Sequence, residues 1–326
     1  MPEPSPAHVV TILPTDTLAF GLQLPIQSQS KLYAADWERD AGATGLARVA
    51  QAADQSGFFY VGVCDHTAIP ERLADTMGTV WYDTVATLGW LAAQTSRVHL
   101  LSHVYVGALR HPLRAAKEFA TLDLLSNGRV IAGIGAGHVE EEFEALGGDF
   151  GGRGPATDEA VSSLAAALVD EFPVLPGPRW PARGLGVAPR PVRQPRPPIW
   201  VGGSSVPALR RAARFADGWL PQTPGRRDLP PLIDQLRRLR TELRDGAPIE
   251  VGSLTEPVYV TDGTDPSWEL PKRTVVGSAE HVAESLREYA ALGVDQLQVR
   301  FPARSLEELC DQITLFGTEV GPLLTR

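Results

Sequence analysis

The sequence predicts a (β/α)8 barrel, the TIM-barrel fold, and three observations support this class. First, eight short apolar segments typical of strands alternate with segments of helical periodicity. Second, no hairpin turn joins two neighbouring strand segments, and parallel strands need crossovers of the kind seen here. Third, the segment after the first strand, Pro25-Ile26-Gln27, contains no glycine. An open doubly wound sheet, the main rival, usually carries Gly-x-Gly-x-x-Gly at that point.

The strands are predicted where short apolar runs are bounded by proline, glycine or polar residues. The first run ends at Pro25, and the second extends from Phe58 to Cys64 with only apolar residues and one glycine. The expected strands are residues 18–24, 58–64, 98–104, 129–134, 199–201, 218–220, 249–254 and 296–301.

The helices are predicted from apolar residues at helical spacing and from their end signals. The first helix buries one face and closes at Gly57. The helix after strand three begins at Pro112, where the missing N–H costs nothing, and Asn127-Gly128 ends it. The last begins with a capping box, Ser305-x-x-Glu308. The others are expected over residues 82–94, 158–170, 208–215, 231–243 and 278–292.

Two segments fall outside this alternation. Residues 1–17 are proline-rich and lack helical periodicity, so we expect a loose N-terminal leader before a single barrel domain over residues 18–326. Residues 147–198 contain a helix and then nine prolines between Pro173 and Pro198, which exclude a sheet interior or a long helix there. We expect this insertion to be an excursion from the barrel after the fourth strand.

The composition is that of an ordinary globular protein, with 43% hydrophobic and 21% charged residues. A net charge of −9 argues against nucleic acid as a partner. No apolar stretch approaches the ~20 residues that span a bilayer, and the N-terminus lacks the basic region of a secretory signal. Cys64 and Cys310 are too few for a disulfide framework or a cysteine zinc site. We therefore expect a reduced, cytoplasmic protein.

Three of the seven histidines lie at the C-terminal ends of predicted strands, where barrel active sites are built. His66 follows Asp65, His103 ends the third strand, and His138 follows the fourth strand. His66 and His138 are therefore candidate acid–base catalysts. Position alone does not separate a proton-transfer pair at Asp65-His66 from a capping aspartate beside an exposed histidine. Cys64 is interpreted as inert core.

The strongest local signal is Gly202-Gly203-Ser204-Ser205, between the fifth strand and a helix. Two glycines allow the backbone to approach a ligand closely, a serine can cap the helix, and exposed N–H groups favour phosphate. A structural turn is the alternative. Five arginines follow, some of which must face solvent: Arg210, Arg211, Arg214, Arg226 and Arg227.

These motifs resemble one family, the luciferase-like flavin and deazaflavin oxidoreductases, whose members are (β/α)8 barrels of the bacterial luciferase type. The resemblance covers most of the chain. The matching segments are Phe20-Gly-Leu-Gln-Leu-Pro25, Gly57-Phe-x-x-Val-x-Val-x-Asp65-His66, Arg110-His-Pro112, Lys117-x-x-Ala-Thr-Leu-Asp-x-Leu-Ser-x-Gly-Arg129, Gly133-x-Gly-x-Gly137, Pro198-Ile-Trp-Val-Gly-Gly203 and Ala-Arg-Phe-Ala-Asp-Gly-Trp219.

The resemblance implies a planar cofactor in the barrel mouth, with residues 202–205 at its phosphate. Asp65 would contact the pyrimidine side or the hydroxylated edge of the ring. The His103–Val104 peptide matches a bulge that is often cis in this family, where Val104 would support one ring face. The cofactor-binding residues expected from the motifs are Asp65, His103, Val104, Ala136, Gly137, Gly202, Gly203, Ser204 and Ser205.

The resemblance also gives His66 the position of an acid–base histidine in deazaflavin-dependent sugar-phosphate dehydrogenases. Those enzymes have a glutamate where this chain has His138 and a threonine where it has Ala136. This departure argues against glucose 6-phosphate as the substrate.

The leading hypothesis is a coenzyme F420-dependent oxidoreductase that transfers a hydride between deazaflavin C5 and a small organic substrate. An FMN-dependent monooxygenase of the same superfamily is the alternative. A barrel hydrolase with zinc on the rim histidines and Asp65 is a remote third, because the usual closely spaced ligand pair on one strand is missing. A non-catalytic binding barrel would leave those histidines unexplained. The family resemblance implies a homodimer.

Overall fold

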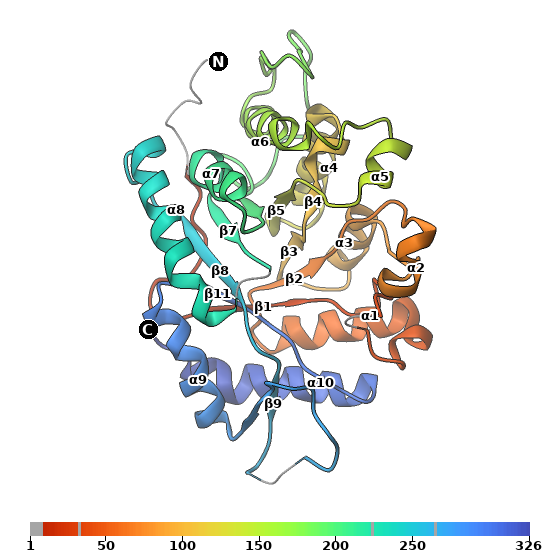
Figure 1. The fold of residues 1–326 in the computed structure, drawn as a ribbon, viewed down its shortest axis with the longest axis vertical. Helices are drawn as coiled ribbons and strands as arrows, with labels where there is room; N and C mark the ends of the chain where they lie inside the picture. The colour runs from red at the N-terminus through yellow and green to blue at the C-terminus, as the bar shows by residue number, and fades with distance from the viewer. Residues whose placement is uncertain (1–8, 32–33, 223–224, 264–265) are drawn as a thin grey trace.

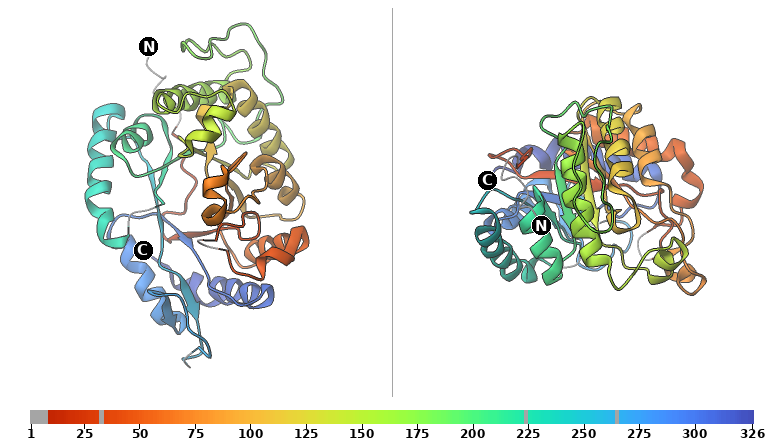
Figure 2. Two further views of the ribbon diagram at one scale, coloured as in Figure 1. Left: turned by 45° about the vertical axis from the view of Figure 1, so that its right-hand side comes forward. Right: turned by 90° about the horizontal axis from the view of Figure 1, so that it is seen from above.

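Eight parallel strands close into a barrel in the computed structural model, which describes residues 9–31, 34–222, 225–263 and 266–326 (Figures 1 and 2). Each strand pairs with the next, and the last pairs with the first. In this order they are β1 (Ala19–Gln23), β2 (Tyr60–Val63), β3 (His99–Ser102), β5 (Val130–Gly135), β6 (Ile199–Gly202), β7 (Gly218–Leu220), β8 (Glu250–Leu254) and β11 (Gln296–Val299). The predicted (β/α)8 barrel is confirmed.

The helices predicted between the strands are all present, and their end signals act as expected. Pro112 occupies the first turn of its helix, and Ser305 Oγ accepts a hydrogen bond from the Glu308 N–H at 3.1 Å. These helices are α1 (Glu38–Gln55), α3 (Thr84–Ala92), α4 (Pro112–Leu125), α6 (Arg153–Val169), α7 (Val206–Phe215), α8 (Leu229–Arg244), α9 (Ala279–Ala291) and α10 (Leu306–Leu315).

Four short elements were not predicted, because they span too few residues for a periodic pattern. Two are helices in loops at the C-terminal ends of strands, α2 (Glu71–Met77) and α5 (Glu140–Ala145). The other two, β9 (Val258–Val260) and β10 (Val275–Gly277), form a separate parallel pair between β8 and α9.

The predicted third strand is interrupted, which corrects the expectation of one continuous strand over residues 98–104. β3 ends at Ser102, a cis peptide joins His103 to Val104, and β4 (Tyr105–Val106) then resumes the pairing. Both β3 and β4 pair with β5, so the bulge lies at the C-terminal end of the barrel wall.

The inner face of the barrel holds its own apolar cluster. Strand residues alternate between the two faces of the wall, so Val61 and Leu100 pack against the helices while Tyr60, Leu101 and Trp200 point inward. Two inward glycines make room for large neighbours. A Cβ on Gly21 would lie 2.3 Å from the Tyr60 ring, and one on Gly218 would lie 2.4 Å from the Trp200 ring.

The prediction of a loose leader is wrong for residues 9–17; residues 1–8 lie outside the described residues. The backbone N–H of Val10 donates to Asp217 Oδ1 at 2.9 Å, and that of Leu13 donates to Glu250 Oε1 at 2.7 Å. Ile12 and Leu13 pack against the inner cluster of the barrel. We call residues 9–17 the N-terminal strap. Proline richness removed helical periodicity, but it did not prevent specific docking.

The excursion after β5 contains α5, α6 and then a long loop over residues 170–198. This loop projects beyond α6 at the top of Figure 1, and its described pairing is one bridge between Leu175 and Ala182. Among the described helices, none combines the length and the apolar character that a membrane span requires.

Candidate active site at the barrel mouth

Two of the three rim histidines come together at the C-terminal end of the barrel. His66 follows β2 and His138 follows β5; their ring centroids lie 5.3 Å apart and the ring planes are nearly perpendicular, at 87°. Trp81, from the loop before α3, packs its ring edge-to-face on His66 at 4.6 Å. His66 is largely buried, with 9% of its side chain exposed, whereas His138 is exposed.

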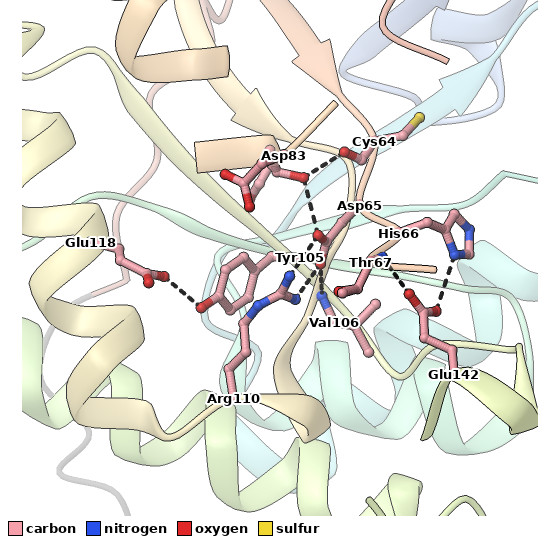
Figure 3. A network of polar contacts seen from close by, with 12 residues as sticks. Cys64, Asp65, His66, Thr67, Asp83, Tyr105, Val106, Arg110, Glu118 and Glu142 are labelled. Carbon is pink, nitrogen blue, oxygen red and sulfur yellow. Dashed lines mark hydrogen bonds and ion pairs between the residues drawn. The ribbon is translucent and has the colours of Figure 1, made fainter. Parts of the chain in front are cut away.

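Glu142 is a site residue that the sequence reasoning missed. It lies on α5, and only 3% of its side chain is exposed. Oε2 lies 3.1 Å from Nδ1 of His66, while Oε1 accepts the backbone N–H groups of Thr67 and Ala68 (Figure 3). Burial acts to raise the pKa of Glu142, but the hydrogen bonds from His66 and these two N–H groups outweigh burial and lower it.

His138 has a different electrostatic environment. Partial desolvation lowers its pKa, the neighbouring His66 lowers it further, and only the charge of Glu142 acts in the opposite direction. A lowered pKa keeps the imidazole of His138 neutral at neutral pH. The two predicted acid–base candidates are therefore inequivalent, because among the described residues a carboxylate is hydrogen-bonded to the ring of His66 and none to that of His138.

Asp65 is engaged by the protein at both carboxylate oxygens. Arg110 donates to Oδ1 at 2.8 Å and to Oδ2 at 2.5 Å, and the Val106 N–H donates to Oδ2 at 2.7 Å (Figure 3). Thr84 Oγ1 lies 3.2 Å from Oδ1, but its shorter hydrogen bond goes to the Cys64 carbonyl. These hydrogen bonds tie the loop after β2 to the bulge after β3, and the contact of Asp65 with a cofactor ring stays a prediction.

A cavity of about 430 Å³ opens beside this ion pair. His66 and His138 do not line it. The lining residues are Thr67, Asp83, Thr84, Val85, Ala86, Tyr105, Leu109, Arg110, His111, Arg114, Glu118 and Leu146.

The bulge after β3 pushes Val104 over two glycines at the ends of the neighbouring strands. A Cβ on Gly135 would lie 2.3 Å from Val104 Cγ2, and one on Gly202 would lie 3.0 Å from Val104 Cγ1. The buried Gly202, predicted at a phosphate, thus has a packing role. These two glycines leave room for Val104 on the inner side of the rim.

His103 lies apart from the other two histidines, buried below the rim. Nε2 lies 2.6 Å from the Gln222 side-chain nitrogen, and Nδ1 is buried without a hydrogen-bond partner in the described part of the chain. Burial lowers the pKa of His103 to about 4, so the ring is neutral. Nearby, burial raises the pKa of the Cys64 thiol to about 12, in agreement with an inert core residue.

The segment after β6, which is predicted to bind a phosphate, forms a turn that leads into α7. Gly203 has φ +99°, a conformation that favours glycine, and its carbonyl accepts the Trp219 indole N–H at 2.7 Å. Ser205 caps α7, with its Oγ 3.4 Å from the Ala208 N–H. Of the neighbouring arginines, Arg211 pairs with Asp158, and Arg226 pairs with Glu256 and Glu288.

The residues of the described segments contain no group of three histidine, cysteine, aspartate or glutamate side chains arranged to hold a metal ion. The zinc hypothesis therefore lacks a ligand set in this part of the chain.

A model of the luciferase-like monooxygenase family matches residues 18–272. An uncharacterised protein of Mycobacterium tuberculosis is 29% identical over 288 residues, covering 82% of this chain and 91% of that protein. The F420-dependent glucose-6-phosphate dehydrogenase of Beutenbergia cavernae is 35% identical over 175 residues, covering 52% of this chain and 49% of the dehydrogenase. The oxygenase component of the flavin-dependent trigonelline monooxygenase of Acinetobacter baylyi is 28% identical over 158 residues, covering 48% of this chain and 42% of that protein.

Two solved structures share the fold. The monooxygenase RslO1 of Streptomyces bottropensis aligns with a TM-score of 0.75 at 21% identity, covering 94% of this chain and 99% of the monooxygenase. The F420-dependent tetrahydromethanopterin reductase of Methanopyrus kandleri aligns with a TM-score of 0.73 at 19% identity, over 94% and 99% of the two chains.

Proposed function

This chain belongs to the luciferase-like monooxygenase family, and we propose that it is a coenzyme F420-dependent oxidoreductase acting on a small organic substrate. The family contains oxidoreductases and monooxygenases that use F420 or a flavin. The observation that carries the proposal is the His66–Glu142 pair at the rim, because hydride transfer to or from a polar bond requires a partner for the accompanying proton.

The residues at the mouth fit a planar ring with an anionic tail. Val104 provides an apolar surface at the rim for one ring face, and the neutral His103 leaves one buried ring nitrogen for a polar atom of the ring. Gly203 and the N-terminal end of α7 would hold the phosphate, since backbone N–H groups at a helix start favour anions. Ser204 and Ser205 flank this turn, while Ala136 and Gly137 lie at the end of β5 beside His138.

When bound, F420 would supply a two-electron hydride donor or acceptor at C5. The chain's own contribution is positioning and proton transfer. His66 gives its proton to the substrate oxygen during reduction of a carbonyl, or takes the hydroxyl proton during oxidation of an alcohol. The carboxylate of Glu142 holds the His66 ring through Nδ1. His138, which stays neutral, forms the side of the rim next to His66 and lacks a carboxylate hydrogen-bonded to its ring.

An FMN-dependent monooxygenase is the second candidate, favoured by the similarity to the oxygenase component of a flavin-dependent enzyme. The two candidates differ in the fate of oxygen. A reduced flavin activates oxygen, which a deazaflavin does poorly.

The discriminating experiment follows cofactor absorbance with a panel of small alcohols and carbonyl compounds, with and without oxygen. Substrate-dependent turnover of F420 that oxygen does not alter supports the proposal, whereas protein-dependent formation of an oxygenated product with reduced FMN overturns it. Replacement His66→Asn should leave F420 affinity intact and lower turnover ~10²-fold or more. An unchanged rate would remove His66 from the reaction.

A further inference from the structure

We propose that Glu142 is a positioning residue that holds His66 in one tautomer, with the proton on Nδ1, so that Nε2 is the nitrogen that exchanges a proton with the substrate. The part concerning the substrate rests on the proposed function. The part concerning the tautomer is a property of the protein alone.

The two carboxylate oxygens of Glu142 have different hydrogen-bond partners. Oε1 accepts the backbone N–H groups of Thr67 and Ala68, and Oε2 is left for the imidazole at 3.1 Å. One side chain of α5 is therefore anchored to the loop after β2 and fixes the ring that this loop carries (Figure 3). The anchor makes the carboxylate a rigid partner, which a free glutamate would not be.

Nδ1 of His66 is the donor in the hydrogen bond between His66 and Glu142. An ionised carboxylate has only acceptors, so the short contact requires Nδ1 of His66 to be the donor. The lowered pKa of Glu142 keeps it ionised at neutral pH. In the neutral imidazole the proton then lies on Nδ1, and Nε2 carries a lone pair. Protonation of Nε2 creates an imidazolium directly beside the negative charge of Glu142.

Aromatic contacts restrict rotation of the His66 ring. Trp81 and His138 each contact the His66 ring edge-to-face, with centroids 4.6 Å and 5.3 Å away. A ring flip, which exchanges Nδ1 with Cδ2 and Nε2 with Cε1, would break the hydrogen bond to Glu142 and disturb both aromatic contacts. Three contacts, two from the segment after β5 and one from the loop before α3, thus fix which nitrogen is available.

The charged and titratable groups around His66 come from several elements. Glu142 lies on α5, His138 in the loop before α5, and Asp65 precedes His66 in the chain. The charge of Asp65 is balanced by Arg110. Glu141, beside Glu142, pairs at the surface with Arg72. Glu142 is therefore the uncompensated negative charge nearest the ring.

The test is Glu142→Gln, with Glu141→Gln as the matched control on the same helix. A glutamine keeps an oxygen for the N–H groups of Thr67 and Ala68, but it presents an NH2 donor to Nδ1. The swap should therefore move the imidazole proton to Nε2. The measurement is the set of ring 15N and 1H chemical shifts of His66 in the cofactor-free protein at neutral pH, assigned by comparison with His66→Asn.

We expect Nδ1–H in the wild type and in the Glu141→Gln protein, and Nε2–H in the Glu142→Gln protein. Loaded with F420, the Glu142→Gln protein should turn over ~10²-fold more slowly with unchanged cofactor affinity, as a wrong tautomer predicts. An Nε2–H tautomer in the wild type overturns the proposal without any variant, and so does an unchanged tautomer in folded Glu142→Gln protein.

The tautomer of His66 and F420-dependent turnover are measured separately, so the positioning role of Glu142 and the proposed function can fail independently. A tautomer that changes in Glu142→Gln, together with absence of any F420-dependent turnover in the wild type, overturns the proposed function and leaves the tautomer assignment supported. A tautomer that does not respond overturns the positioning role, whichever cofactor the enzyme uses.

Discussion

Glu250 is a buried carboxylate whose protonation makes the stability of the folded protein depend on pH. Its Oε1 accepts the N–H groups of Ile12 and Leu13, its Oε2 accepts the Trp200 indole N–H at 3.0 Å, and 6% of the residue is exposed. Burial raises the pKa of Glu250 to about 7, and the negative charge of Asp217 adds to this effect, against the hydrogen bonds. The folded protein therefore binds this proton more tightly than the unfolded chain does.

The sign of the pH effect follows from linkage. Below a pH of about 4.3, the pKa of a glutamate in the unfolded chain, Glu250 is protonated in both the folded and the unfolded protein, and its contribution to stability is fully present. That contribution is lost as the pH rises through the folded pKa of about 7. Glu250→Gln should remove the effect. We predict that the unfolding free energy of the wild type relative to this variant falls by about 3 kcal/mol between about pH 4.5 and 7.5.

Comparison with the variant is needed because His99 and His103 act in the opposite direction. Burial is the main cause that lowers the pKa of each to about 4, so they add stability as pH rises from about 4 to 6.5. Urea titrations of both proteins across this range give the difference. A difference that stays constant with pH would show that Glu250 titrates normally.

The sequence pattern identified His66 as a candidate but did not identify its partner, Glu142. Glu142 is one of three consecutive acidic residues, and a sequence alone does not show which of them points inward. The two side chains are 76 positions apart and meet only because β2 and β5 end at the same face of the barrel. Asp65 follows β2 at the rim, and its hydrogen bonds with Arg110 and Val106 depend on the bulge after β3, which the sequence pattern does not show.

The bulge between β3 and β4 is the element that shapes the inner side of the rim. Gly135→Ala would place a Cβ 2.3 Å from Val104 Cγ2, so we predict a loss of roughly 2 kcal/mol in stability and weaker cofactor binding. Gly89→Ala on α3 is the control, because a Cβ there meets nothing within 4 Å. The control should gain up to about 1 kcal/mol, as alanine does in helices. Equal stability and cofactor affinity of the two variants would contradict the packing role of Gly135.

The N-terminal strap packs against the end of the barrel at which β7 and β8 begin, away from the rim. Removal of residues 1–13 would expose the inner cluster around Trp200 and remove the backbone N–H donors of the strap from Glu250 Oε1 and Asp217 Oδ1. We predict a loss of about 3 kcal/mol or more in unfolding free energy, measured by chemical denaturation. A truncated chain as stable as the full chain would show that the strap contributes little.

Elements with many periodic residues were predictable and elements without them were not. The long helices and all eight barrel strands follow from apolar spacing, capping and turn residues. The short α2 and α5 carry no such pattern. The docking of the strap depends on carboxylates of β8 and of the residue before β7, which are more than 200 positions away in the sequence.

For the whole molecule, assembly remains a prediction from the family resemblance. The part of α3 that is not buried includes Ala86, Gly89 and Trp90, with no charged side chain, and 38% of Trp90 is exposed. Surface helices normally carry polar residues on this part. We expect a homodimer in sedimentation equilibrium, and a shift to monomer in Trp90→Glu. A monomeric wild type would contradict this expectation.

The proposed function requires a deazaflavin in the barrel mouth, with its phosphate at the turn after β6. The most direct measurement is an equilibrium fluorescence titration of the purified protein with F420 and, separately, with FMN. We predict saturable, stoichiometric quenching by F420 and much weaker binding of FMN. Tight FMN binding without F420 binding would contradict the choice of cofactor, and absence of binding by both would contradict a flavin-type site at the barrel mouth.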